Sequence, residues 1–390
     1  MRLLLIILFL AGCAHQSVEP PVVTPRTPVF WVTPMGHDQW DVRTLMKDKC
    51  PALSVGGKTV EMKARYKPSA AFIDPVCEAR IPRGAEGAGL PPLNTHPKRF
   101  VVFGDTGCRI KITAHKTQIQ GCNDPKEWPF AEIAQAAAAW KPDLVIHVGD
   151  YNYRESECPP GHKECEGSVA GDNLTSWTQD FFTPAAPLLA AAPWIFVRGN
   201  HETCDRAGAG WEHFLAAGAY QTCPLSEDPR TVTLGDRDYV IVDSAEGMNT
   251  AMTLRHAKRP AKHSWLITHR PLMTPGEENG DDNTVKLPKG WNEALSVLLV
   301  GHVHTISLNV FKDSRPPEFI LGNGGSALAV NRQTEAQRKE AAETEWQDFG
   351  FTTFEDLGGG KWDLRVHDRH GADVIKCKWN EFQRGLKCAK

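Results

Sequence analysis

Residues 143–153 read DLVIHVGDYNY, an apolar run that stops at Gly149 and Asp150. The same pattern recurs on both sides of it, in RFVVFGDTG (99–107), WIFVRGNHE (194–202), SWLITHR (264–270), SVLLVGHVH (296–304) and EFILGNGG (318–325). Helices are expected between several of these strands, near residues 130–140, 174–190 and 211–217. Strands that alternate with helices indicate an α/β protein whose strands are buried.

Polar side chains stand where these apolar strands stop. Because ligands of open α/β sheets gather at the carboxyl ends of strands, we expect these side chains to converge on one point. They provide a mixed set of oxygen and nitrogen donors of the kind that binds first-row metals. The set comprises Asp105, Asp150, Tyr153, Asn200, His269, His302 and His304. It is large enough for two ions that share one carboxylate, and Asp150 is the natural bridge.

Five sequence blocks, in this order, resemble the calcineurin-like metallophosphoesterases and, more narrowly, the purple acid phosphatases. The blocks are GDTG (104–107), GDYNY (149–153), GNHE (199–202), the TH of THRP (268–269) and GHVH (301–304). The resemblance covers about residues 99–330. It implies an α/β (α+β) fold, a four-layer αββα sandwich of two mixed sheets flanked by helices.

The resemblance also implies roles for single residues. It assigns Asp105, Asp150, Tyr153 and His304 to a ferric ion. It assigns Asp150, Asn200, His269 and His302 to a second, divalent ion, which is Fe, Zn or Mn. A phenol normally titrates near pH 10, so only a strongly Lewis-acidic ion such as Fe(III) makes Tyr153 a good ligand at acidic pH.

Three further side chains near these blocks have expected roles. His201 resembles the histidine that contacts the substrate in this family and is the catalytic candidate. Glu202 is expected to support the ligands without binding an ion. Arg109 is a candidate for steering an anion, with an ordinary surface arginine as the alternative. His147, inside its strand, is expected to be a core histidine.

The function that the resemblance implies is hydrolysis of small phosphate monoesters by metal-activated hydroxide at a binuclear centre. One alternative is a phosphodiesterase or nucleotidase of the same fold, with Mn or Zn in both sites. A second alternative is a non-catalytic lipoprotein of the cell envelope. Such a protein should have lost ligands, and none is missing from the set. No segment identifies the leaving group.

The amino terminus resembles a bacterial lipoprotein signal. Residues 1–12 form a basic start and a short apolar run, which are typical of a cleaved signal peptide. The ending LAGC (10–13) resembles a lipobox, which implies a lipid on Cys13. Residues 13–27 are Pro-rich and predict an extended tether. We therefore expect a protein of the bacterial envelope, anchored in the outer membrane by lipid alone and facing the periplasm or the exterior.

Composition and cysteine usage fit an exported globular protein. The chain carries 44 Lys and Arg against 47 Asp and Glu, a net charge of −3, so no affinity for nucleic acid is expected. Ten cysteines besides Cys13 predict five disulfides in an oxidising compartment. Pairing of nearest neighbours gives Cys50–Cys77, Cys108–Cys122, Cys158–Cys165, Cys204–Cys223 and Cys377–Cys388. The sequence indicates no oligomeric state.

The sequence after the tether is divided into two predicted regions. Residues 28–97 are too few for an immunoglobulin-type sandwich of about 100 residues, so a small β-rich region is expected there. Residues 98–390 are assigned to the metallophosphoesterase domain. Within it, residues 334–345 predict a charged helix, and the stretch after residue 350 predicts antiparallel strands around a Gly turn.

Overall fold

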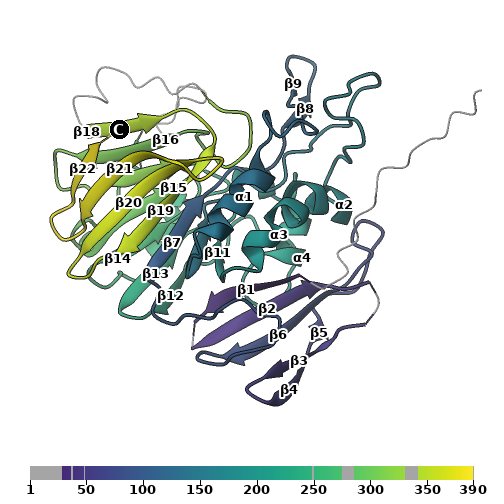
Figure 1. Ribbon diagram of the computed structural model, residues 1–390, viewed down its shortest axis with the longest axis horizontal. Coiled ribbons are helices and arrows are strands. Elements are labelled where there is room, and N and C mark those ends of the chain that lie inside the picture. The colour runs from purple at the N-terminus through teal and green to yellow at the C-terminus, as the bar shows by residue number, and fades with distance from the viewer. Residues whose placement is uncertain are drawn as a thin grey trace, which may run out of the picture.

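The computed structural model describes residues 29–36, 38–47, 49–247, 250–274, 285–329 and 341–389. The predicted signal peptide, Cys13 and the tether up to residue 27 lie outside the described residues. Two seven-stranded sheets pack face to face and form the centre of the molecule (Figure 1).

The first sheet combines three parallel strands with an antiparallel meander. Its strands, in spatial order, are β11 (Trp194–Phe196), β10 (Leu144–His147), β7 (Arg99–Phe103), β19 (Gly350–Asp356), β20 (Lys361–Asp368), β21 (Asp373–Asn380) and β22 (Gly385–Ala389). β7 pairs in parallel with β10 and antiparallel with β19. The carboxyl ends of β7, β10 and β11 therefore lie along one edge.

The second sheet has the same mixed character. Its strands, in spatial order, are β12 (Arg230–Leu234), β13 (Arg237–Ile241), β14 (Ser264–Ile267), β15 (Leu295–Val300), β17 (Glu318–Leu321), β16 (Ile306–Phe311) and β18 (Ala341–Trp346). β13, β14, β15 and β17 run parallel to one another. Every residue of β14 and β15 is buried, as expected for strands covered on both faces.

Aromatic side chains fill the space between the sheets. The ring of Trp265 on β14 lies 5.3 Å from that of Phe100 on β7 and 5.1 Å from that of Trp362 on β20, measured between centroids. All three side chains are fully buried. Large rings packed from both sides fix the distance between the two sheets.

Helices cover both outer faces. The first sheet is covered by α1 (Phe130–Ala139), α2 (Leu174–Trp177), the π-helical turn Thr178–Phe182, α3 (Thr183–Leu189) and α4 (Gly208–Phe214). The second sheet is covered by the shorter α5 (Thr250–His256) and α6 (Trp291–Ala294). The predicted αββα sandwich of two mixed sheets is confirmed. No described helix has the length and apolarity needed to cross a membrane.

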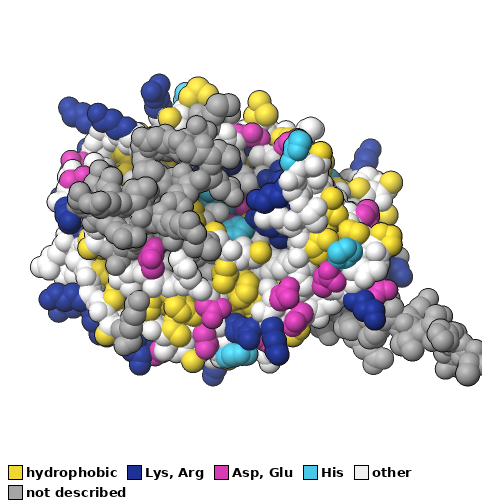
Figure 2. Space-filling model, turned by 90° about the horizontal axis from the view of Figure 1, so that it is seen from above, with side chains coloured by type: hydrophobic (Ala, Val, Ile, Leu, Met, Phe, Trp, Pro, Cys, Tyr) yellow, Lys and Arg dark blue, Asp and Glu magenta, His cyan; other side chains and the backbone are white. Residues whose placement is uncertain are grey.

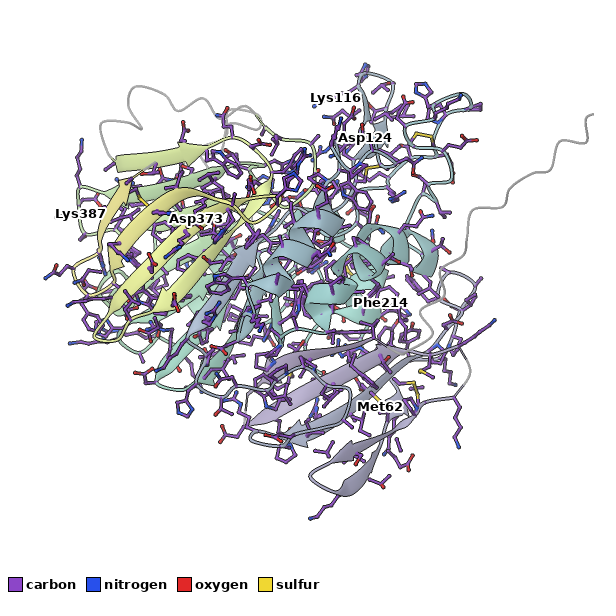
Figure 3. The ribbon with its side chains drawn as sticks, viewed as in Figure 1. Met62, Lys116, Asp124, Phe214, Asp373 and Lys387 are labelled. Atoms are coloured by element: carbon purple, nitrogen blue, oxygen red, sulfur yellow. A yellow bond between two sulfur atoms is a disulfide. The ribbon has the colours of Figure 1, made fainter. Side chains whose placement is uncertain are left out.

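The N-terminal β-rich region is a sheet of four strands with an attached hairpin. The sheet has the order β1 (Phe30–Met35), β2 (Gln39–Leu45), β6 (Val76–Pro82) and β5 (Lys63–Ala64), and the hairpin consists of β3 (Ala52–Val55) and β4 (Lys58–Glu61). It docks where α4 ends: Arg43 donates to the carbonyl oxygens of Phe214 and Ala216. Figure 3 shows Phe214 at this boundary.

The predicted helix at 334–345 is wrong over its described part. Residues 341–346 form β18, which pairs antiparallel with β16 from Ile306 opposite Trp346 to Phe311 opposite Ala341. Residues 334–340 lie outside the described residues. The charged composition favours a helix locally, but β18 pairs along the edge of β16 over six residues, and this tertiary pairing overrides propensity.

The structure contains five disulfides, and they join the pairs predicted from sequence order. They are Cys50–Cys77, Cys108–Cys122, Cys158–Cys165, Cys204–Cys223 and Cys377–Cys388. The second of them closes a loop that contains a small hairpin, β8 (Ile110–Ile112) and β9 (Thr117–Ile119), which the sequence did not predict. This hairpin stands above the edge where the parallel strands end (Figure 1).

Candidate metal centre

The seven predicted ligands come from strand ends of both sheets. Asp105 follows β7, Asp150 and Tyr153 follow β10, and Asn200 begins a 3-10 turn after β11. His269 follows β14 of the second sheet, and His302 and His304 follow β15. The site therefore lies across the seam between the two sheets. Figure 2 looks down on this side of the molecule, where histidines lie within a hollow bordered by Lys and Arg side chains.

One group of donors surrounds the phenol oxygen of Tyr153. This oxygen lies 3.1 Å from Oδ1 of Asp105, 2.8 Å from Oδ2 of Asp150 and 2.9 Å from Nε2 of His304. One donor atom from each of these three partners lies within 4.8 Å of the others. Four donors drawn together in this way can surround a single ion.

A second group surrounds the amide oxygen of Asn200. Its Oδ1 lies 2.9 Å from Nε2 of His269 and 2.7 Å from Nδ1 of His302. Donor atoms of Asp150, His269 and His302 lie within 4.8 Å of one another. Asp150 belongs to both groups, which is the position that a bridging carboxylate requires. The donors present thus fit two metal ions, while the ion that each residue binds stays a prediction.

Burial and the neighbouring histidines have opposite effects on the pKa values of the carboxyl groups in this cluster. Burial raises the pKa of Asp105, although the neighbouring His304 lowers it. Burial would also raise the pKa of Asp150, but His269 and His201 hold it well below its ordinary value. Buried carboxylates of this kind require nearby positive charge. Bound metal cations would provide it directly.

The same carboxylates also shift the pKa values of the histidine and tyrosine residues predicted as ligands. Burial lowers the pKa of His269, but Asp150 outweighs this effect and raises it to about 9. Burial and then the charge of Asp105 raise the pKa of Tyr153 well above 10. Without cations, the cluster therefore keeps the phenol protonated, and Asp150 at 2.8 Å and Asp105 at 3.1 Å are the carboxylates placed to accept its hydrogen bond.

The backbone is strained at three of the ligands. Asp105, Asp150 and His302 have φ angles of 57°, 64° and 70°, in the left-handed region that residues other than Gly rarely adopt. Each of them directly follows a Gly in its motif. A β-carbon on Gly301 would lie 2.6 Å from Oδ2 of Asp105, so the loops can only approach this closely with Gly there. Strain of this kind concentrates at functional sites.

Neighbouring groups fix the orientation of the ligands. Glu202 accepts backbone N–H bonds from Asp150, Tyr151, Asn152 and Gly199, so it joins the loops after β10 and β11. The role expected for Glu202 in supporting the predicted ligands stays a prediction. Ring nitrogens that face away from the site are also held. Nδ1 of His269 lies 2.8 Å from the carbonyl oxygen of Val148, and Nδ1 of His304 lies 2.6 Å from that of Ala327. Such partners set which nitrogen faces the metal.

His201, the catalytic candidate, lies beside this cluster. Its ring centroid is 3.6 Å from that of Tyr153, and its Nε2 is 3.9 Å from Oδ2 of Asp150. Nδ1 lies 3.0 Å from Oε1 of Glu155, and Arg206 contacts both the ring and the Glu155 carboxylate. Burial lowers the pKa of His201 to about 4.

Sequence reasoning missed the two side chains that hold His201. Glu155 and Arg206 follow their motifs by several residues, and neither belongs to a recognisable pattern. Arg270, which follows His269 directly, was also not singled out, although its Nη1 lies 3.1 Å from Nε2 of His302.

His147 is fully buried beneath the site and bonds Thr106, as a core histidine would.

The family of the chain follows from a comparison of its sequence with protein-family models. The family model described as calcineurin-like phosphoesterase matches residues 98–305, more than half of the chain. The chain belongs to the calcineurin-like phosphoesterase family. It is accordingly a hydrolase that acts on phosphate esters. No curated protein sequence matches the chain significantly.

Two solved structures show how this phosphoesterase relates to others in fold. A purple acid phosphatase, PPD1, from yellow lupin (Lupinus luteus) seeds has 14% sequence identity and a TM-score of 0.59, covering 90% of this chain and 74% of its own. PhoD has 12% identity and a TM-score of 0.51, covering 93% of this chain and 92% of its own. At such identities the likeness establishes the fold, and the substrate has to be argued from the site.

Proposed function

We propose that this phosphoesterase is a binuclear phosphatase of the purple acid phosphatase type, which hydrolyses phosphate monoesters. The observation that carries the proposal is the position of the Tyr153 oxygen, within 3.1 Å of Asp105, Asp150 and His304. A phenolate among these donors favours a trivalent ion, Fe(III). The second ion, held by Asp150, Asn200, His269 and His302, is proposed to be Fe, Zn or Mn.

The residues of the chain have separate tasks in this reaction. When bound, the two ions supply Lewis acidity that polarises the phosphoryl oxygen and lowers the pKa of a shared water. Asp150 holds the spacing of the two ligand groups because it belongs to both. His201 is held by Glu155 at Nδ1 and by Arg206, and its Nε2 lies 3.9 Å from Oδ2 of Asp150. In its protonated form it can donate from Nε2 to a phosphoryl oxygen or to the leaving alkoxide.

The visible spectrum and metal content of the purified protein test the proposed centre. We expect a broad charge-transfer band in the visible range from tyrosinate bound to Fe(III), with two metal equivalents per chain. Tyr153→Phe should abolish the band. Tyr151→Phe is the matched control, because Tyr151 is equally buried but donates its hydroxyl to the carbonyl oxygen of Val197. A colourless protein with two Zn or Mn would overturn the ferric site while keeping the hydrolase.

The substrate class requires a separate measurement. We expect the metal-loaded protein to hydrolyse p-nitrophenyl phosphate with a higher kcat/KM than bis(p-nitrophenyl) phosphate. A preference for the diester would replace the phosphatase with a phosphodiesterase of the same fold. Loss of both activities after treatment with a chelator, and their return with the original metals, would assign them to the metal centre.

We further propose that the protein is exported and held in the bacterial envelope by a lipid on Cys13. The LAGC stretch at 10–13 and the Pro-rich residues that follow it support this proposal. Mass spectrometry of the mature protein should find an acylated Cys13 as its first residue. Cys13→Ser should leave the protein uncleaved or soluble. A mature amino terminus elsewhere would contradict the proposed anchor.

A further inference from the structure

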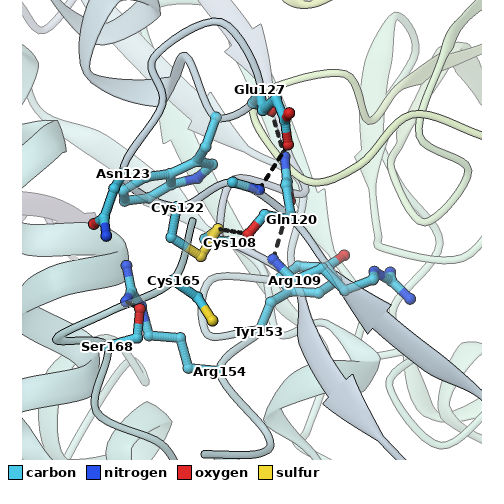
Figure 4. Close-up of a disulfide and its surroundings, with 12 residues drawn as sticks. Cys108, Arg109, Gln120, Cys122, Asn123, Glu127, Tyr153, Arg154, Cys165 and Ser168 are labelled. Carbon is cyan, nitrogen blue, oxygen red and sulfur yellow. Dashed lines mark hydrogen bonds between the residues drawn. A yellow bond between two sulfur atoms is a disulfide. The ribbon is translucent and has the colours of Figure 1, made fainter. Parts of the chain in front are cut away.

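Arg109 reaches the ligand group around Tyr153 from the β8–β9 side. Its Nη2 lies 3.4 Å from Nε2 of His304, the nitrogen that faces Tyr153, and its guanidinium carbon lies 4.8 Å from the centre of the Tyr153 ring. Figure 4 shows Arg109 and Tyr153 next to the Cys108–Cys122 disulfide. The guanidinium thus lies against the donors predicted to hold the ferric ion.

The positive charge of Arg109 is not neutralised by an ion pair with any residue in the described part of the chain. Its Nη1 lies 3.5 Å from the neutral amide oxygen of Gln118, and its buried Nε has no hydrogen-bond partner among the described residues. The charge of Arg206, by contrast, is paired with the carboxylate of Glu155, although its buried Nε also has no hydrogen-bond partner among the described residues. A half-buried guanidinium with an unused donor is suited to an anion.

The surrounding chain holds Arg109 in a fixed relation to His304. The backbone N–H of Arg109 donates to Oε1 of Gln120 at 3.0 Å, and the same oxygen accepts the N–H of Ala327 at 3.1 Å. The carbonyl oxygen of Ala327 in turn bonds Nδ1 of His304 at 2.6 Å. Cys108, the residue before Arg109, is fixed by its disulfide to Cys122. The guanidinium is therefore anchored to the same frame as a metal ligand.

We propose that Arg109 binds a non-bridging oxygen of the substrate's phosphoryl group and thereby selects dianionic phosphate monoesters over monoanionic diesters. This inference rests on the proposed function of the centre. A guanidinium presents a planar fork of donors that matches phosphate oxygens, and it stays charged at every relevant pH. A monoester offers it three non-bridging oxygens and a second negative charge. A diester replaces one of those oxygens with an ester group.

Substitution of Arg109 in the full, metal-loaded chain tests this selection. Arg109→Met keeps much of the packing against Tyr153 and removes the charge. It is expected to lower kcat/KM for p-nitrophenyl phosphate roughly 10- to 100-fold, the usual effect of one hydrogen bond to a charged group. For bis(p-nitrophenyl) phosphate we expect a loss of less than about 3-fold, so the ratio of the two values should fall. Arg109→Lys should give an intermediate ratio.

Binding of inorganic phosphate gives a readout that does not depend on turnover. Titration calorimetry should show a weaker dissociation constant in Arg109→Met than in the wild type, at equal metal content. Lys116→Met is the matched control: Lys116 is an exposed cation at the tip of the same hairpin (Figure 3), and its loss should change neither measurement.

Two results would overturn the role of Arg109: an equal loss on both esters, or unchanged phosphate affinity in Arg109→Met. A wild-type protein that binds no metal or hydrolyses neither ester would instead overturn the proposed function. In that case the phosphate titration alone decides the role of Arg109, because it compares affinity without turnover. The two failures are therefore distinguishable.

Discussion

At Gly199 the backbone runs directly against the carboxylate of Asp150. A β-carbon there would overlap both Oδ1 and the backbone nitrogen of Asp150. The residue cannot therefore carry a side chain while Asp150 stays in the position that places it in both donor groups. The close approach explains why Gly precedes Asn200 in the motif: Gly199 makes room for a ligand of the neighbouring loop.

Gly199→Ala should displace Asp150 and weaken both ligand groups at once. A shift of about 1 Å in a catalytic group typically costs about 100-fold in rate, so we expect at least that loss of kcat together with reduced metal content. Metal analysis and activity measured on the same sample check this. Gly385→Ala is the control, because a β-carbon on Gly385 would meet nothing within 4 Å. Full activity in Gly199→Ala would contradict the argument.

Residues of the centre differ in how well the sequence predicts them. The convergence of the seven predicted ligands could be anticipated because each directly follows a strand or lies at a fixed spacing within a motif, and their binding of metal stays a prediction. Glu155 and Arg206 could not, since their contacts with His201 depend on how two separate loops fold over each other. The same holds for the orientation of Arg109 toward His304. The spacing within a motif predicts which side chains lie at the end of a strand. Contacts between separate loops depend on the folded structure and cannot be predicted from spacing.

At the scale of elements, the loop that contains the β8–β9 hairpin is closed by one covalent link. Cys108–Cys122 closes the loop that contains the hairpin, and Cys377–Cys388 links the strands β21 and β22 away from the site. The two loops have similar lengths, with sequence separations of 14 and 11 residues. Their effects on stability should therefore be similar, and their effects on activity should differ.

Replacing both cysteines of either pair with Ala should lower the free energy of unfolding by about 3 kcal/mol, from the loop entropy that each link removes. Only Cys108→Ala/Cys122→Ala should also lower kcat/KM for a monoester, because it frees the segment that carries Arg109. Denaturant titrations and kinetics on both variants test this. Equal activity in the two variants would show that the hairpin holds its position without the link.

Elements with strong local patterns could be predicted from the sequence, and those that depend on distant partners could not. The parallel strands and α1 lie where the apolar pattern indicates. β18 was predicted as a helix because its charged, Ala-rich sequence favours one, and only the edge of β16 makes it a strand. β8 and β9 are three residues each, too short for an alternating pattern to stand out.

At the scale of the molecule, two buried arginines join the N-terminal sheet to the catalytic domain. Arg65 donates to the carbonyl oxygens of Glu212, Ala216 and Gly218 and pairs with Glu78. Arg43 donates to two carbonyl oxygens of the same region, those of Phe214 at the end of α4 and of Ala216 just after it. These carbonyl oxygens would lose their partners if the N-terminal region separated. The region is thus expected to unfold together with the domain it covers.

Arg65→Met should lower the free energy of unfolding by about 3–5 kcal/mol, because it leaves Glu78 without its closest cation and the carbonyl oxygens of Glu212 and Gly218 without the Arg65 donor. Thermal unfolding of the wild type should show one transition. Arg80→Met, which removes an exposed arginine from β6, should leave the melting temperature nearly unchanged. Two separate transitions in the wild type would contradict the coupling.

The free energy of unfolding should also fall as the pH rises, because of the carboxyl group of Glu227. Burial and the neighbouring Asp243 raise the pKa of this carboxyl from 4.5 to about 7. Between these values the folded chain binds a proton that the unfolded chain has released, so the folded state loses stability as pH rises. Glu227→Gln should therefore reduce the fall in melting temperature between pH 5 and pH 8. Glu86→Gln, at an exposed site, should keep the wild-type profile.

The seam between the two sheets gives bound ions a mechanical role in addition to their chemistry. Asp105, Asp150, Tyr153 and Asn200 follow strands of one sheet, and the three histidines predicted as ligands follow strands of the other. An ion that binds both sets cross-links the sandwich at its edge. Loss of the ions should let the sheets separate there first, so hydrogen exchange in the demetallated chain should rise at the ends of β7 and β15 before it rises in their centres.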